Sequence, residues 1–429
     1  MPSIYISKRV HLILDLQLEF FPFPNRIMTR IFRPNAYFEE ELSAGEIFPS
    51  GLEAQNAILE SCFLVLTGPE KEFGEILSHS LPEERWYEYW KNRVGSSLPT
   101  PVRIQKGKPE SLVQEPLSLE EWGQISDYSE KIGFKLDPTA FERSARLSSK
   151  IKQTEWKKKF HMQEFPVWIF KNDSEWKSHG EILRLQNPPF PLYVRKLEFG
   201  FSGRQEFLLP SDLGKASQKD FFKIRDVGSV LEPWMDRTQD FSLLFSAEKG
   251  SFRQVASTLL LSNQKGKYSG TWLASEEESF WYSEKMDPVL RNLSDFAPDY
   301  TGYGSIDSFV YRTIEGQEEL RRVSEINFRW TMGRILWELC RKFPLSDVRD
   351  LLLFVSHKGI PQEDSYRKLE EWSREEPTWR IFPLSPFYGP KGKPMPKVLL
   401  WFRIKRDEVS DPRKTASDLA AKARIKFGG

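Results

Sequence analysis

The feature that most constrains the fold is a series of short apolar segments separated by polar or glycine-containing turns. The series runs from 166 to 274 and includes PVWIF, PLYVRKLEFG, EFLLP, DFSLLFS, STLLLS and YSGTWLA. Short apolar segments that are bounded by turn residues are typical of strands. Strands that follow one another at short intervals usually pair antiparallel. The sequence therefore predicts a largely antiparallel sheet in the middle of the chain.

Length and proline distribution indicate several structural regions. A chain of 429 residues has room for about two or three domains. Proline is dense at 96–122 and at 383–397, and proline density favours loops or linkers. We expect an N-terminal α/β region at 1–121, a middle body at 122–345 and a C-terminal extension at 346–429.

Several further elements are predicted around the sheet. Ile4–Phe21 and Cys62–Leu66 are apolar and β-branched, which favours buried strands. Thr139–Phe160 is predicted to be one long helix, because Pro138 stands at its start and lysines lie near its end. Gly333–Phe343 is predicted to be a second helix.

The C-terminal part of the chain has one predicted strand and a basic tail. The strand is Lys397–Arg406, and the tail is Pro412–Gly429. The tail is either a weak anion-binding arm or a solvated, frayed helix. The aromatic segment at 84–93, ERWYEYWKNR, has helical spacing and interleaved acids, so we expect it to pack against the core rather than to stack on nucleic acid.

Composition excludes several classes of protein. Lys and Arg number 62 and Asp and Glu 61, so no global field attracts a polyanion and we expect no nucleic-acid partner. Charged residues interrupt every apolar run before about 18 residues, so we expect no membrane span. The N-terminus lacks the pattern of a secretory signal, which favours a cytoplasmic location.

Missing motifs narrow the chemistry further. The sequence contains no CxxC, Walker A, HExxH or helix-opening GxGxxG pattern. Cys62 and Cys340 lie in apolar runs, so we expect two buried, reduced thiols. The five histidines are scattered. Thiolate zinc sites are therefore excluded, and hydride transfer, zinc hydrolysis and P-loop chemistry are disfavoured.

One predicted hairpin carries a set of oxygen ligands. Ser305–Arg312 and Glu319–Asn327 are predicted to be its two strands. Residues two apart in a strand face the same side, so Glu325 and Asn327 project together, and Asp307 can join them from the partner strand. Carboxylate and amide oxygens suit Mg²⁺ shared with phosphate oxygens. The alternative is a polar sheet face without a metal.

A second predicted hairpin carries cations and glycines. It runs over Tyr193–Leu209, with Lys196 in its first strand and Arg204 after the glycine-rich turn. Gly200 and Gly203 let backbone N–H groups approach an anion closely. Lys196 would add a positive charge beside a phosphate. The alternative is an ordinary hairpin with a glycine turn.

A third segment precedes the strand that begins near Asp240. Glu232 and Trp234 lie in a short extended stretch before a polar break. Such a stretch can offer backbone groups to a flat base, and Asp240 can accept hydrogen bonds from a ribose. The alternative is a turn with an incidental acid.

Taken in order along the chain, these features resemble the ATP-grasp superfamily, of which D-alanine–D-alanine ligase is a familiar member. The resemblance spans about 122–343. The WG at Trp122 and the segments RKLEFGFSGR, LEPW and EINFRWTMGR are similar to a group of bacterial ATP-grasp proteins. The matching residues are Lys150, Lys196, Gly200, Ser202, Gly203, Arg204, Glu232, Trp234, Asp240, Asp307, Glu325 and Asn327.

The resemblance implies an α+β ATP-grasp fold, in which two α+β subdomains clamp ATP after a small α/β pre-ATP-grasp domain. It implies a ligase that uses ATP and Mg²⁺ to convert a carboxylate into an acyl phosphate, which an amine attacks. Lys150 and Lys196 would contact phosphates, and the glycine loop would exclude water. Asp307, Glu325 and Asn327 would hold Mg²⁺. The implied partners are a small-molecule or peptide carboxylate and an amine.

The sequence departs from the family pattern at one position. Many family ligases have an arginine two residues before the metal aspartate, where this chain has Ser305. Arg329 lies two residues beyond Asn327, so strand periodicity predicts that it substitutes as a catalytic residue, with Arg204 as a second one. An ATP-grasp phosphotransferase and a non-catalytic binding protein remain as alternative functions.

Overall fold

The computed structural model describes most of the chain from residue 30 onwards. The described residues are 30–45, 53–66, 75–78, 82–94, 98, 101–105, 108–109, 118–129, 133–178, 190, 192–199, 206–210, 228–262, 268–313, 315–389 and 392–428. The predicted strand Ile4–Phe21 and the predicted loop residues Gly200, Ser202, Gly203 and Arg204 lie outside them. No helix of the described residues has the length and apolarity that crossing a bilayer requires.

The N-terminal region contains a small sheet whose central strands are parallel. Its order is β4-β3-β2-β1-β5, and β1 pairs in parallel with both β2 and β5. The strands are β1 (Arg30–Arg33), β2 (Glu75–Ser78), β3 (Val102–Gln105), β4 (Lys108–Pro109) and β5 (Ser118–Glu121), and the helices are α1 (Phe38–Ala44), α2 (Glu53–Leu66) and α3 (Glu84–Val94). The predicted α/β architecture of this region is confirmed.

The prediction of a strand at Cys62–Leu66 is wrong. These residues form the last turns of α2. Cys62, Phe63, Leu64 and Val65 are all fully buried, so the helix is apolar on every side at this end. A short continuous apolar run is compatible with a buried strand and with a buried helix, and periodicity cannot separate the two.

An antiparallel sheet of eight strands forms the body of the molecule. Its order is β16-β15-β12-β13-β14-β17-β19-β18, with every neighbouring pair antiparallel. The strands are β12 (Asp236–Glu248), β13 (Ser251–Ser262), β14 (Tyr268–Leu273), β15 (Gly302–Arg312), β16 (Glu318–Asn327), β17 (Val348–Ser356), β18 (Trp379–Pro383) and β19 (Lys397–Lys405). Residues beyond 345, which the sequence assigns to an extension, therefore continue this sheet.

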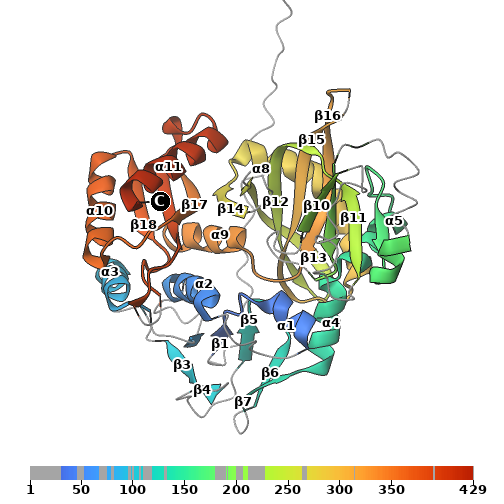
Figure 1. The fold of residues 1–429 in the computed structure, drawn as a ribbon, viewed down its shortest axis with the longest axis horizontal. Coiled ribbons are helices and arrows are strands. Elements are labelled where there is room, and N and C mark those ends of the chain that lie inside the picture. The colour runs from blue at the N-terminus through green and yellow to red at the C-terminus, as the bar shows by residue number, and fades with distance from the viewer. Residues whose placement is uncertain are drawn as a thin grey trace, which may run out of the picture.

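A four-stranded antiparallel sheet lies beside the large one, on the right in Figure 1. Its order is β10-β9-β11-β8. The strands are β8 (Trp168–Phe170), β9 (Leu192–Leu197), β10 (Glu206–Pro210) and β11 (Ser229–Pro233). The predicted hairpin around Lys196 is confirmed, since Lys196 pairs with Glu206 across β9 and β10. A two-stranded ribbon, β6 (Ser126–Ser129) with β7 (Gly133–Leu136), completes the described strands.

Helices cover the sheets and join the regions. They are α4 (Pro138–Ser148), α5 (Lys150–Lys159), α8 (Glu276–Phe296), α9 (Met332–Lys342), α10 (Gln362–Glu375) and α11 (Pro412–Phe427). The single helix predicted over 139–160 is two helices, because Ser149 has extended dihedral angles. Its hydroxyl accepts a hydrogen bond from Lys152 N and so caps α5.

The C-terminal tail is a packed helix rather than a frayed one. Ala416, Leu419, Ala423 and Phe427 of α11 are buried. The Trp272 indole donates to the Pro412 carbonyl over 2.9 Å and fixes the start of the helix. Figure 1 shows α11 and α10 together at one side of the large sheet. The basic residues of α11 therefore line the outside of an element whose apolar face belongs to the core.

The aromatic segment of α3 packs as predicted. Trp86, Tyr89 and Trp90 are buried. Both indole nitrogens donate to the Pro383 carbonyl over 2.8 Å. These contacts join the N-terminal region to the far edge of the large sheet.

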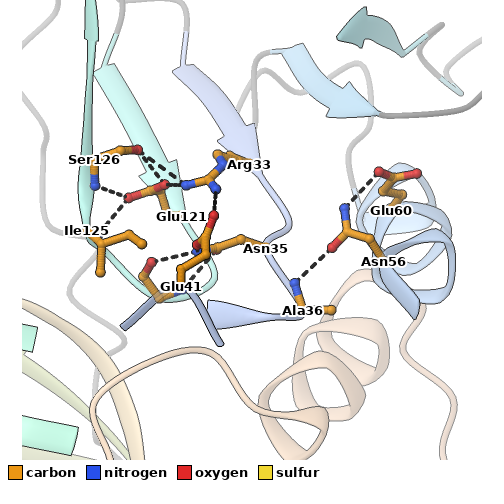
Figure 2. Close-up of polar contacts among 10 residues, drawn as sticks. Arg33, Asn35, Ala36, Glu41, Asn56, Glu60, Glu121, Ile125 and Ser126 are labelled. Atoms are coloured by element: carbon orange, nitrogen blue, oxygen red, sulfur yellow. Dashed lines mark hydrogen bonds and ion pairs between the residues drawn. The ribbon is translucent and has the colours of Figure 1, made fainter. Parts of the chain in front are cut away.

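A buried polar cluster holds the carboxyl ends of β1 and β5 together (Figure 2). The Arg33 guanidinium donates to both Glu41 and Glu121, and all three side chains are fully buried. Glu121 also accepts from Ile125 N at 2.7 Å and Ser126 N at 2.8 Å. Although burial opposes the charge on Arg33, the two carboxylates hold its pKa above the ordinary value.

Replacing Arg33 with Met is expected to destabilise the protein strongly. The change leaves two buried carboxylates without their shared counter-charge, which costs about 3–5 kcal/mol of the free energy of unfolding. Denaturant unfolding measures the change. Arg367→Met is the matched control: Arg367 also pairs with two acids, Asp364 and Glu371, but its side chain is 56% exposed. Equal effects of the two substitutions would contradict a structural role for the buried cluster.

Candidate functional site

A cavity of about 170 Å³ on one face of the large sheet brings together residues that are far apart in the sequence. Lys196 of β9, Asp240 of β12 and Asp307 of β15 all line it. The other lining residues that the sequence analysis identified are Trp122, Glu325, Asn327 and Arg329. The four-stranded sheet and the large sheet therefore meet at one polar cavity, together with Trp122, which directly follows β5.

The carboxylate and amide side chains of the cavity are aligned by the register of β15 and β16. Asp307 lies directly opposite Glu325, and Ser305 lies opposite Asn327. Asp307 accepts from Asn327 Nδ2 at 3.0 Å and from the Ser242 hydroxyl at 2.8 Å. The predicted convergence of the two carboxylates and the amide is thus present in the hairpin.

Asp307 is held in an unfavourable electrostatic environment. Burial, followed by the neighbouring Glu325 carboxylate, raises the pKa of Asp307 to about 6, although hydrogen bonds from Ser242 and Asn327 oppose the rise. Two facing carboxylates repel each other unless a cation lies between or beside them. The environment of Asp307 therefore favours an additional positive charge at this position.

Lys150 supplies part of that charge from the start of α5. Its Nζ atom lies 2.7 Å from Glu325 Oε1, and the Lys150 side chain is largely buried. Burial opposes ionisation of Glu325, but Lys150 and then Lys196 and Arg329 lower the pKa of the carboxyl below its ordinary value. The break at Ser149, which a single long helix would not have, sets the position from which Lys150 reaches Glu325 in the cavity wall.

Lys196 and Glu232 form a buried ion pair behind the cavity. Lys196 lies opposite Val230 and Glu232 opposite Val194, so the two side chains are diagonal neighbours on one face of the sheet. Arg321 contacts the other Glu232 oxygen at 3.4 Å.

Glu232 remains ionised in this arrangement. Burial opposes its charge, but Lys196, Arg321 and Lys157 together lower the pKa of Glu232 to about 2. The sequence places Glu232 in a segment that could contact the base of a nucleotide. In the structure, Glu232 is an ion-pair partner of Lys196.

Asp240 lies where the polar cavity meets a second, larger one of about 770 Å³. Arg237 contacts Asp240 at 3.4 Å, and its guanidinium lies 4.9 Å from the Trp234 ring centre. The second cavity is partly apolar, with Leu192, Trp234, Met235, Leu261, Leu353 and Phe354 in its wall. Trp234 therefore lines this neighbouring cavity rather than the carboxylate cavity.

Arg329 lines the cavity, but not for the predicted reason. The strand β16 ends at Asn327, so strand periodicity no longer applies two residues later. Arg329 lies in the turn before α9 and donates to Glu39 of α1 over 2.7 Å. The N-terminal region therefore holds the Arg329 guanidinium at the cavity wall. This contact joins segments far apart in the sequence, so local sequence could not predict it.

Several polar residues of the cavity were missed by sequence reasoning. Ser242 shares a strand face with Asp240, so period-two spacing could have identified it. Thr258 and Tyr268 come from β13 and β14, and only the strand register brings them here. Thr258 Oγ1, the Tyr268 hydroxyl and Trp122 Nε1 are buried without a partner in the described part of the chain. Three unsatisfied buried groups in one cavity wall indicate a polar occupant.

The N-terminus of α9 closes one end of the cavity. Thr331 caps the helix, and Gly333 lies in its first turn. A Cβ atom on Gly333 would lie 3.0 Å from Thr258 Oγ1, so a side chain here would crowd the threonine. The cavity thus combines cations, carboxylates, hydroxyl groups and a helix N-terminus, a set that suits a highly charged ligand such as a polyphosphate with a divalent cation.

Comparison with known proteins identifies solved structures of the same architecture. No protein-family model and no curated protein matches the chain. N5-carboxyaminoimidazole synthase from Aspergillus clavatus, in complex with ADP and 5-aminoimidazole ribonucleotide, is 11% identical. The match covers 92% of this chain and 99% of that one, with a TM-score of 0.53.

Two further structures give similar results. The carboxyaminoimidazole ribonucleotide synthase of Aspergillus clavatus complexed with ATP is 12% identical over 94% of this chain and 99% of that one, with a TM-score of 0.51. An ADP complex of N5-carboxyaminoimidazole ribonucleotide synthetase is 10% identical over 92% and 96%, with a TM-score of 0.52. At these identities the likeness concerns the fold, and this chain has the α+β ATP-grasp fold.

Proposed function

We propose that this protein is an ATP- and Mg²⁺-dependent ligase that activates a carboxylate as an acyl phosphate for attack by an amine. One observation carries the proposal: Lys196 lines one cavity of an ATP-grasp fold together with Asp307, Glu325 and Asn327, and Lys150 pairs with Glu325 in its wall. Similar folds in solved structures hold ADP or ATP, which supports a nucleotide as one substrate. The substrates would be a small-molecule or peptide carboxylate and an amine.

The two neighbouring cavities match the parts of a nucleotide. We assign the partly apolar cavity beside Trp234 and Met235 to the base, since apolar side chains suit a flat aromatic ring. Asp240, at the boundary between the cavities, would accept hydrogen bonds from the ribose. Lys196 and Lys150, farther along, would contact the phosphates as positive charges.

Asp307, Glu325 and Asn327 would hold Mg²⁺ in the same cavity. The raised pKa of Asp307, caused by burial and by Glu325, fits this assignment because a bound cation would relieve the repulsion. No three His, Cys, Asp or Glu side chains converge in the part of the chain that the structure describes, so the Asn327 amide oxygen would act with the two carboxylates. When bound, Mg²⁺ neutralises the charge of the β- and γ-phosphates.

The remaining residues of the site would position and shield the reacting groups. We assign Arg329, which Glu39 orients, to the transferring phosphoryl group. Thr258 and Tyr268, whose hydroxyl groups have no partner in the described residues, would donate to substrate oxygens. The resemblance assigns shielding of the acyl phosphate from water to the glycine loop with Gly200, Ser202, Gly203 and Arg204, which lies outside the described residues.

Mg-ATP is expected to raise the unfolding temperature, and Glu325→Gln is expected to reduce the rise. At a ligand concentration of about 100 times Kd, binding adds about 2.7 kcal/mol to the free energy of unfolding. That corresponds to a shift of a few degrees for a chain of this length. Thermal unfolding with and without Mg²⁺ measures the effect.

Glu318→Gln is the control for this experiment, since Glu318 lies on the same strand but its side chain is 54% exposed and contacts Arg312 at 3.9 Å. A rise in unfolding temperature that does not need Mg²⁺, or that is the same in Glu325→Gln and Glu318→Gln, would contradict the assigned metal site.

Arg329→Ala is expected to slow ADP formation by about 10²–10³-fold, the loss typical of removing one charge-stabilising donor. Binding of Mg-ATP should persist, because Lys150 and Lys196 remain. A coupled assay of ADP release, run over a panel of carboxylates and amines, measures the rate and reveals the product. The exposed Arg312 provides the control variant Arg312→Ala. Full turnover by Arg329→Ala would refute its assigned role, and a stable phosphorylated product would indicate a kinase.

A further inference from the structure

Lys157 of α5 is a buried lysine that lies behind the cavity and has no role in the proposed reaction. The residue is only 3% exposed. Its Nζ atom makes two long contacts, 3.4 Å each, to the carbonyl oxygens of Val323 and Ser324 in β16. An ammonium group has three protons to donate, and burial without close acceptors is unfavourable.

Charged groups face Lys157 from each neighbouring element. Arg321 of β16 and Lys196 of β9 are cations, whereas Glu232 of β11 and Glu164, which follows α5, are carboxylates. Burial and then Arg321 lower the pKa of Lys157 to about 7, with Lys196 acting in the same direction. Glu232 and Glu164 oppose the decrease. Above neutral pH the ligand-free protein therefore holds Lys157 mostly as a neutral amine.

Nucleotide binding would change the charge that Lys157 faces. Lys196 pairs with Glu232 and also lines the cavity that we assign to the phosphates. A phosphate that draws the Lys196 ammonium towards itself leaves Glu232 with a weaker counter-charge. Glu232 stays ionised, because its pKa is about 2, and its other described partner, Arg321, lies 3.4 Å away and is shared with Glu164.

We propose that Lys157 takes up a proton from solvent when the nucleotide binds and becomes the counter-charge of Glu232 in place of Lys196. Lys157 is then a positioning residue: it contacts no substrate, but it allows Lys196 to transfer its contact from carboxylate to phosphate. This inference rests on the proposed nucleotide site. A hydronium ion or buffer acid gives up the proton, which bonds to the lone pair of Nζ, so the amine becomes an ammonium and the donor becomes its conjugate base.

The direction of the proton movement follows from the charges. In the ligand-free protein the folded-state pKa of Lys157 is below its ordinary value of 10.5, so the proton is lost as the pH rises through about 7. Phosphates bring negative charge and raise the pKa again. Between the two pKa values binding is therefore accompanied by proton uptake, and apparent affinity falls as the pH rises through that range.

Isothermal titration calorimetry with Mg-ADP tests the inference. Titrations at about pH 8 in buffers of different ionisation enthalpy give the number of protons taken up per nucleotide. We expect about one proton for the natural protein, since Lys157 is then mostly neutral before binding and charged afterwards. The uptake should vanish in Lys157→Met, which has no titrating group, and in Lys157→Arg, which is permanently charged.

Lys159→Met is the matched control, because Lys159 lies on the same helix but is 63% exposed and pairs with Asp295. This variant should retain the uptake. Burial lowers the pKa of Lys157, and this lowers the free energy of unfolding of the natural protein at neutral pH. Lys157→Met should therefore unfold no more easily than the natural protein.

The possible failures are distinguishable. Binding of Mg-ADP without any buffer-dependent heat would overturn the inference and leave the proposed function intact. Uptake that persists in both Lys157 variants would assign the proton to another group and would also overturn it. No binding of Mg-ADP by the natural protein would remove the proposed nucleotide site, and the inference with it.

Discussion

Two carboxylates held face to face are the constraint around which the site is organised. The register of β15 and β16 fixes Asp307 opposite Glu325, in the wall of the polar cavity. Such a pair is unfavourable on its own, and the surrounding elements offset it with charge and hydrogen bonds. Lys150 comes from α5, Ser242 from β12 and Asn327 from the same hairpin. Helix α5, strand β12 and the β15–β16 hairpin therefore converge on this pair.

The cations of the site are already paired within the protein. Lys150 contacts Glu325, Lys196 contacts Glu232, and Arg329 contacts Glu39. A ligand with several negative charges must therefore exchange partners with the protein rather than fill an empty positive site. This arrangement keeps Lys196 and Arg329 in the cavity wall, and Lys150 next to it on Glu325, without leaving any of these charges uncompensated in the interior, where an unpaired charge is costly.

Much of the site could be predicted from sequence because its residues lie on strands with a regular period. Asp307, Glu325 and Asn327 required only two short strands and a turn, and Lys196 required one hairpin. The failures concern longer-range structure. The apolar run Cys62–Leu66 is compatible with a buried strand and with a buried helix, and it forms a helix in the packed structure. The Arg33 cluster and the contact of Arg329 with Glu39 join segments far apart in sequence, so no local pattern reveals them.

The C-terminal strands illustrate the same limit. Strand β17 pairs with β14, which lies far away in the sequence, so no local pattern predicts that it joins the large sheet. We propose above that the carboxylate pair and its lysines bind the phosphates of ATP with Mg²⁺. A crystal structure with Mg²⁺ and a non-hydrolysable ATP analogue tests this most directly. We expect phosphates in contact with Lys150 and Lys196, and Mg²⁺ held by Asp307, Glu325 and Asn327. A nucleotide bound elsewhere, or an intact Lys196–Glu232 pair beside phosphates that Lys196 does not touch, would contradict it.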